Sequence, residues 1–245
     1  MKSIISLPFI FIIYLYFYLT PLFEMLGIFN WAFDNYISFS MNCIKIIGLY
    51  DKIEFSGNIN MHVTRNLIIA NHTSVLDNVV LMKLLFTNQY TWNEIVSISR
   101  VSNKKYKNTI MCAHNNLLID RDLEHDMSNK IKLFDSWKNY NKLAIILFPE
   151  GTTNTGKLKT MSEPEKQLSK HIFNKSNEKY ENLLFPKSGL FNLILKEFDR
   201  DIKTLMDLTI IYTKNGKRLL GEKNIFKSIM DDDFRIVVHI DKYKL

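Results

Sequence analysis

A histidine and an aspartate five positions apart form the first pair of residues that could do chemistry. His72 and Asp77 make the pattern His-x4-Asp directly after the apolar run 67–70. If that run is a strand and a helix follows, the carboxylate can orient the imidazole through one ring nitrogen and leave the other to take a proton. A chain of this composition contains about 0.3 such pairs by chance. Alternatively, Ser74 caps the helix with Asp77 as its capping-box partner, and without further motifs this alternative would be preferred.

A second signal follows a continuous apolar run at 143–148. Pro149, Glu150, Gly151 and Thr152 come next. Proline ends a strand ladder and glycine lets another group approach the backbone closely. The sequence Phe-Pro-Glu-Gly-Thr has a chance probability on the order of 10⁻⁵. The alternative is an ordinary turn that ends a strand and leaves Glu150 in solvent.

The third signal is an arginine placed just after another apolar run. Arg121 follows the expected strand at 117–120, although an isolated arginine is usually a surface residue. Open α/β sheets bind ligands at the carboxyl ends of their strands. We therefore expect His72, Arg121 and Glu150 to lie along one edge of a sheet.

The elements that must position these residues begin after residue 50. Short apolar runs alternate there with longer helix-like stretches, which predicts an α/β domain with a mostly parallel sheet flanked by helices. The expected strands are 52–55, 67–70, 94–99, 117–120, 143–148, 208–212 and 234–240, and the expected helices are 75–86, 122–140 and 189–198. Residues 151–182 are polar and favour a long loop with at most one helix.

The first 50 residues differ in composition from the rest and indicate a membrane anchor. Residues 4–23 carry no charge, and as a helix they would cover about 30 Å, the hydrocarbon thickness of a bilayer. We expect a transmembrane helix there and an interfacial helix at about 27–50. The alternative for 4–23 is a buried helix. The predicted organisation is thus an anchor at 1–50 and a catalytic domain at 51–245.

Charge and cysteine content exclude several classes of protein. Charges in residues 1–50 cancel, so the net charge of +7 lies in residues 51–245. That excess suits an anionic membrane or a phosphate-bearing substrate. No zinc-finger spacing or RNA-binding motif accompanies it, and no nucleic-acid partner is expected. Two cysteines, Cys43 and Cys112, cannot form a disulfide framework, and no metal site is predicted.

Together the three motifs resemble the glycerolipid acyltransferase family, typified by 1-acyl-glycerol-3-phosphate acyltransferase. The order matches: Asn-His-x4-Asp at 71–77, a strand followed by Arg121, and Phe-Pro-Glu-Gly-Thr at 148–152. Segments 179–187 and 207–212 are similar to the eukaryotic branch that contains lysophosphatidic acid and lysocardiolipin acyltransferases. The resemblance covers most of residues 50–245.

The resemblance implies transfer of a fatty acyl chain from acyl-CoA to the free hydroxyl of a lysophospholipid, with lysophosphatidic acid converted to phosphatidic acid. It implies His72 as general base and Asp77 as its orienting partner. The residues implied around the lysophospholipid are Arg121, Glu150, Gly151, Thr152 and Lys187. Acyl-CoA is a co-substrate, and neither cofactor nor metal is expected. The protein is expected to contact membrane lipid, in an endomembrane of the endoplasmic reticulum type.

Two alternatives to this activity stay open. One is a remodelling acyltransferase for another lysophospholipid, such as lysocardiolipin or lysophosphatidylinositol. The other is a noncatalytic membrane-docking protein that keeps the fold. Three positions depart from the family pattern: Asn115 replaces a common glycine, and Thr153 and Lys187 each replace a common arginine. A lysine would bind phosphate as a point charge without the bidentate fork of arginine.

Overall fold

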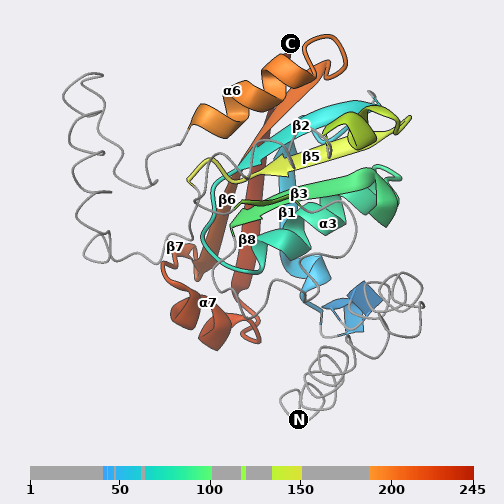
Figure 1. Ribbon diagram of the computed structural model, residues 1–245. Helices are drawn as coiled ribbons and strands as arrows, with labels where there is room; N and C mark the ends of the chain where they lie inside the picture. The colour runs from blue at the N-terminus through green and yellow to red at the C-terminus, as the bar shows by residue number, and fades with distance from the viewer. Residues whose placement is uncertain are drawn as a thin grey trace, which may run out of the picture.

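The computed structural model describes residues 41–61 except 43 and 47, and residues 64–100, 117–119, 134–150 and 188–245. A central sheet has the strand order β1-β8-β6-β2-β5-β3-β4, with β7 paired to β6 (Figure 1). The strands are β1 (Ile53–Gly57), β2 (Arg65–Ala70), β3 (Ile95–Arg100), β4 (Leu117–Ile119), β5 (Leu143–Leu147), β6 (Thr204–Lys214), β7 (Lys217–Arg218) and β8 (Phe234–Lys244). From β6 to β4 every pairing is parallel, whereas β8 runs antiparallel to β6 and pairs in parallel with β1.

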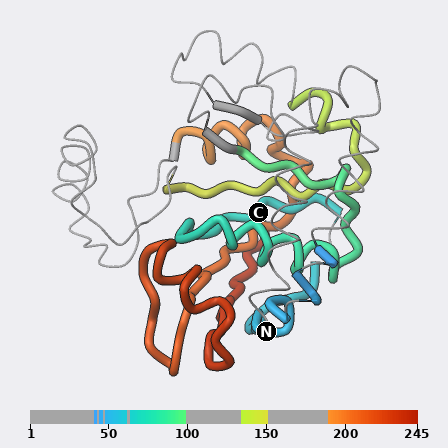
Figure 2. Tube along the Cα trace, turned by 90° about the horizontal axis from the view of Figure 1, so that it is seen from below, coloured from blue at the N-terminus to red at the C-terminus, as the bar shows by residue number. Residues whose placement is uncertain are grey.

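Helices cover both faces of this sheet. They are α3 (Asp77–Thr87), α6 (Ser188–Glu197) and α7 (Glu222–Ser228), with 3-10 turns η1 (Tyr50–Lys52) and η2 (Trp92–Glu94). Residues 134–138 are also helical. One core cluster joins α3 and α7 to the sheet, and a second joins α6 and residues 134–138 to the opposite face. Figure 2 shows the corresponding layers, with α6 on one side of the strands and α3 and α7 on the other.

Helix α3 is apolar on nearly all sides, which explains why it lies deep in the core. Val80, Leu81 and Leu84 are fully buried against the sheet. Its one basic side chain, Lys83, donates from Nζ to the carbonyl oxygens of Tyr50 at 2.7 Å and Ile53 at 3.0 Å. Burial lowers the pKa of Lys83, and the charge of Asp51 partly opposes that effect. These two bonds hold the second half of α3 to the start of β1.

The predicted α/β domain, with a central sheet flanked by helices, is confirmed. All seven expected strands are present, but β6 and β8 are longer than predicted, and β7 and α7 were not predicted. Of the helix expected at 122–140, the described part is 134–140, helical to residue 138. The helix expected at 75–86 begins two residues later, at Asp77.

The predicted anchor falls almost wholly outside the described residues. Residues 4–23 and the interfacial segment up to residue 40 are among those not described. In the part of the chain that the structure does describe, every helix is too short or too polar to cross a bilayer.

Candidate functional site

The turn between β2 and α3 places His72 at the carboxyl end of the parallel sheet. Strand β2 ends at Ala70 and α3 begins at Asp77. His72 Nδ1 lies 2.9 Å from Asp77 Oδ2. Because a carboxylate only accepts hydrogen bonds, Nδ1 carries the proton and donates it, which leaves Nε2 as the basic nitrogen. The pair predicted from the His-x4-Asp spacing is therefore formed.

Exposure differs sharply between the two members of this pair. The Asp77 side chain is completely buried, whereas 19% of the His72 side chain is accessible. The His72 ring stacks on Phe148, with ring centroids 4.3 Å apart and planes 27° from parallel. Phe148 directly follows β5, the neighbour of β2 in the sheet. The imidazole is thus held on one edge by a carboxylate and on one face by an aromatic ring.

The Asp77 carboxylate accepts four hydrogen bonds. Oδ2 accepts the Nδ1–H of His72 and the backbone N–H groups of Thr73 at 2.7 Å and Ser74 at 3.0 Å. Oδ1 accepts the Tyr212 hydroxyl at 2.5 Å. The capping box expected from Ser74 and Asp77 is not formed, because α3 has Leu76 at its N-cap position and no side-chain cap hydrogen bond, although Asp77 Oδ2 does bind the Ser74 amide. Stabilising the turn and orienting the histidine are therefore two tasks of one side chain and do not exclude each other.

Strand β6 contributes two contacts that sequence reasoning missed. The first is the Tyr212 hydroxyl on Asp77. In the second, the Asn71 side chain accepts the Ile210 N–H at 2.6 Å and donates to the Ile210 carbonyl oxygen at 3.0 Å. Asn71 therefore extends the pairing of β2 with β6 beyond the end of β2. A signal for Tyr212 was present, because alternate residues of β6 face the core and a buried tyrosine hydroxyl needs a partner.

Glu150 lies at the same edge of the sheet as His72. The register pairs Ile69 with Leu147 in β2 and β5, so His72 and Glu150 each come three residues after a paired position. Glu150 is buried, with 5% of its surface exposed. The alternative that leaves Glu150 in solvent is wrong. A carboxylate withdrawn from water at this edge of the sheet suits a role in the site.

The other predicted site residues lie outside the described part of the chain. These are Arg121, Gly151, Thr152 and Lys187. Strand β4, which pairs in parallel with β3, ends two residues before Arg121. The described residues contain no group of three or more His, Cys, Asp or Glu side chains that could hold a metal ion.

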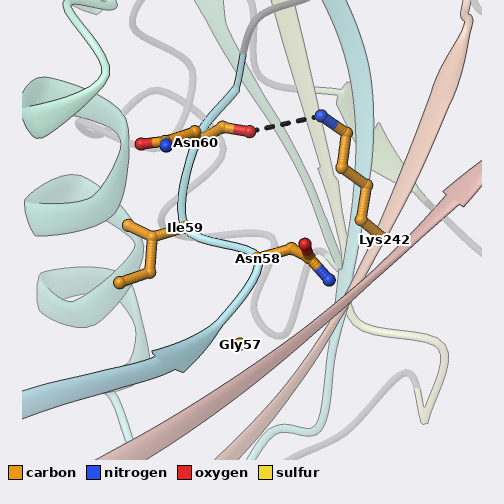
Figure 3. Close-up of a pocket in the computed structure, with 5 residues that line it drawn as sticks. All are labelled: Gly57, Asn58, Ile59, Asn60 and Lys242. Carbon is orange, nitrogen blue, oxygen red and sulfur yellow. Dashed lines mark hydrogen bonds between the residues drawn. The ribbon is translucent and has the colours of Figure 1, made fainter.

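A shallow pocket lies at the opposite edge of the sheet. Gly57, Asn58, Ile59, Asn60 and Lys242 line it, and Lys242 Nζ donates to the Asn60 carbonyl oxygen at 3.2 Å (Figure 3). Strands β1 and β8 run antiparallel to β2, so their carboxyl ends lie at the same edge of the sheet as the start of β2. This pocket is consequently separate from the His72 site.

Comparison with known proteins gives the family. A solved structure of the 1-acyl-sn-glycerophosphate (LPA) acyltransferase PlsC from Thermotoga maritima has 14% sequence identity and a TM-score of 0.37, over 100% of this chain and 87% of that one. A search of curated proteins finds no match. A family model described as Acyltransferase matches residues 52–212, which include His72, Asp77 and Glu150. The match spans well over half of the 245 residues, and the chain belongs to the acyltransferase family.

Proposed function

We propose that this acyltransferase moves a fatty acyl chain from acyl-CoA to the free hydroxyl of a lysophospholipid, with lysophosphatidic acid as acceptor and phosphatidic acid as product. The observation that carries the proposal is the hydrogen bond between His72 Nδ1 and Asp77 Oδ2 at the carboxyl end of β2. It leaves a partly exposed imidazole with a basic Nε2 in a member of the acyltransferase family.

The proposed reaction needs a base because the alcohol is the unreactive partner. His72 Nε2 removes the hydroxyl proton while the hydroxyl oxygen attacks the thioester carbonyl carbon. The carbon–sulfur bond then breaks, and the thiolate of coenzyme A leaves and takes a proton from the imidazolium. A positioned general base contributes about 10² to 10⁴ in rate. Asp77 holds the ring in the required tautomer and lies beside the positive charge that forms on it.

Direct transfer without a covalent enzyme intermediate fits the surroundings of His72. Thr73 and Ser74 directly follow His72 in the sequence, and both are buried. Thr73 Oγ1 accepts a hydrogen bond from Asn71 Nδ2 at 3.1 Å, and Ser74 Oγ accepts the Leu76 N–H at 3.3 Å. A buried hydroxyl that supports the turn is poorly placed to attack a thioester, so the base acts on the acceptor.

For the acceptor phosphate we propose Arg121 as the main partner. A guanidinium can bind two phosphate oxygens at once, which a lysine cannot do. Lys187 would add a single positive charge. Glu150 cannot attract a phosphate, and we assign it to holding Arg121 or a glycerol hydroxyl. Gly151 and Thr152 would line the same subsite.

The acceptor and donor are both amphipathic, so the enzyme must meet them at a membrane. The uncharged segment 4–23 supports a transmembrane anchor, and the aromatic-rich segment that follows it suits the interface. We propose an endomembrane of the endoplasmic reticulum type as the location.

The test is a panel assay with the purified full-length protein in phospholipid vesicles. Radiolabelled acyl-CoA is offered with lysophosphatidic acid, lysophosphatidylinositol, lysocardiolipin or no acceptor, and labelled product is separated from free acid. We expect labelled phosphatidic acid from the wild type and a rate of its formation lower by about 10² to 10⁴ from His72→Gln. Preference for another lysophospholipid would make the protein a remodelling acyltransferase. No transfer to any acceptor would favour the noncatalytic docking protein.

A further inference from the structure

Tyr212 and His72 bind opposite oxygens of the same buried carboxylate. The Tyr212 hydroxyl donates to Asp77 Oδ1 at 2.5 Å, and His72 Nδ1 donates to Asp77 Oδ2 at 2.9 Å. Tyr212 is separated from Asp77 by 135 residues in the sequence. Strand β6 therefore supplies a support for the histidine pair that the turn between β2 and α3 does not contain.

The Tyr212 side chain is itself firmly held. Its surface is 1% exposed, and its ring packs against Phe234 of β8 with centroids 6.3 Å apart. Two residues earlier, the backbone of Ile210 is bound on both its N–H and its carbonyl by Asn71. Because Asn71 immediately precedes His72, β6 is tied to the histidine turn at two places.

The hydroxyl stays protonated at neutral pH. Burial raises the pKa of Tyr212 far above its ordinary value, and the negative charge of Asp77 raises it further. A neutral phenol in this position is a permanent donor to the carboxylate.

We propose that Tyr212 is a positioning residue that acts through Asp77 to keep Oδ2 on His72 Nδ1, which fixes the tautomer with basic Nε2. The proposal rests on the proposed function for its effect on rate. Backbone amides hold Oδ2, and Tyr212 holds Oδ1, so the carboxylate is fixed at both ends. Without the hydroxyl, Oδ1 would be a buried charged oxygen without this donor, and the carboxylate would shift to find another.

The variant Tyr212→Phe removes the hydroxyl and keeps the ring. Its matched control is Tyr90→Phe, since Tyr90 is 3% exposed and its hydroxyl accepts from Asn66 Nδ2 at 2.6 Å. Asn66 lies near the start of β2, at the edge away from His72. Both variants lose one buried phenol hydroxyl with a side-chain partner, but only Tyr212 touches Asp77.

Two readouts are needed, one of which requires no turnover. In ¹⁵N-histidine-labelled protein, with the His72 signal assigned by its loss in His72→Gln, we expect the Nδ1–H tautomer in the wild type and in Tyr90→Phe. In Tyr212→Phe we expect a smaller share of that tautomer. In the acyl transfer assay we expect kcat to fall about 10-fold for Tyr212→Phe, the size of one hydrogen bond to a charged group, with both KM values unchanged.

The outcomes separate this proposal from the proposed function. An unchanged His72 tautomer in Tyr212→Phe, or equal loss of kcat in both tyrosine variants, would overturn the positioning role. In an Asp77→Ala background, which leaves Tyr212 no side chain at position 77 to bind, adding Tyr212→Phe should change the His72 signal no further, and a further change would show that Tyr212 does not act through Asp77. A tautomer change in a protein that transfers no acyl group would support the positioning of His72 and refute only the reaction.

Discussion

The substitution Asp77→Asn separates the two tasks of this carboxylate. Asparagine has the same shape but replaces one oxygen by an NH₂ group. Asp77 Oδ2 accepts three donors, two of them the backbone amides of Thr73 and Ser74. The amide NH₂ cannot take that position, because it would face three N–H groups. The amide oxygen must therefore replace Oδ2, and the NH₂ must face the Tyr212 hydroxyl, which can accept.

This orientation keeps the hydrogen bonds but removes the charge. Hydrogen bonds to charged groups are worth about 1.5 to 3 kcal/mol and neutral ones about 0.5 to 1.5 kcal/mol, so each of the four bonds weakens. A neutral amide also costs less to bury than a carboxylate, which offsets part of that loss, and we expect a net loss of about 1 to 3 kcal/mol in unfolding free energy. The effect on catalysis should be larger. An imidazolium forms when His72 takes the proton, and no anion lies beside it in the variant. We expect kcat to fall by about 10²-fold, the lower end of what a general base contributes, and by less than in His72→Ala, because the imidazole stays in place.

The measurement is kcat with saturating acyl-CoA and lysophosphatidic acid, alongside thermal unfolding. Asp201→Asn is the control, since Asp201 Oδ2 lies 3.3 Å from Arg65 Nη1 at the start of β2, away from His72. That variant should lose some stability and keep its activity. If Asp77→Asn were destabilised but kept kcat within about threefold of the wild type, Asp77 would serve only the turn, and the reasoning from its contact with His72 would fail.

Three further predictions concern other parts of the chain. Arg121→Ala should lower kcat/KM for the lysophospholipid by about 10- to 150-fold through KM, with little change in the acyl-CoA KM; equal effects on both substrates would remove Arg121 from the acceptor subsite. The full-length protein should stay with membranes in alkaline carbonate and lose much of that attachment when residues 1–23 are deleted; release of the intact chain would contradict the anchor. Burial raises the pKa of the Asp207 carboxyl, and Asp241, opposite it on β8, raises it further. Native Asp207 therefore binds its proton more tightly than Asp207 in the unfolded chain does. As pH rises and the carboxyl ionises, the stability that this bound proton contributes is lost. Asp207→Asn should therefore increase unfolding free energy at pH 7 by about 0.2 to 1 kcal/mol, a gain that should vanish as pH falls below about 4; an unchanged stability at pH 7 would show that the two carboxylates do not repel.

The centre of the fold could be predicted because its signals are local and strong. Strand β5 (Leu143–Leu147) is buried along its whole length, and its sequence is apolar at every position. The contact between His72 and Asp77 also depends on a short turn, so spacing alone could suggest it. The sequence also held a hairpin signal that was not used: Asn215 and Gly216 both have positive φ between β6 and β7, as the Asn-Gly pair of a tight turn requires.

The support of the site from β6 could not be predicted in the same way. Tyr212 meets Asp77 only because β6 pairs with β2 and continues beyond its end, which depends on strand order and register. Local patterns fix neither. The same holds for Phe148, whose stacking on His72 follows from the pairing of β2 with β5. The reacting groups thus follow the ends of strands, where local sequence can suggest them. Their partners Tyr212 and Phe148 are brought to them by the register of the sheet.

The central claim is that His72 is the base for acyl transfer to a lipid hydroxyl. The most direct measurement is the rate of phosphatidic acid formation from labelled acyl-CoA and lysophosphatidic acid, by wild type and His72→Ala at equal amounts of folded protein in the same vesicles. The account predicts turnover by the wild type and a rate lower by about 10² to 10⁴ in the variant. Comparable rates for the two proteins would contradict it.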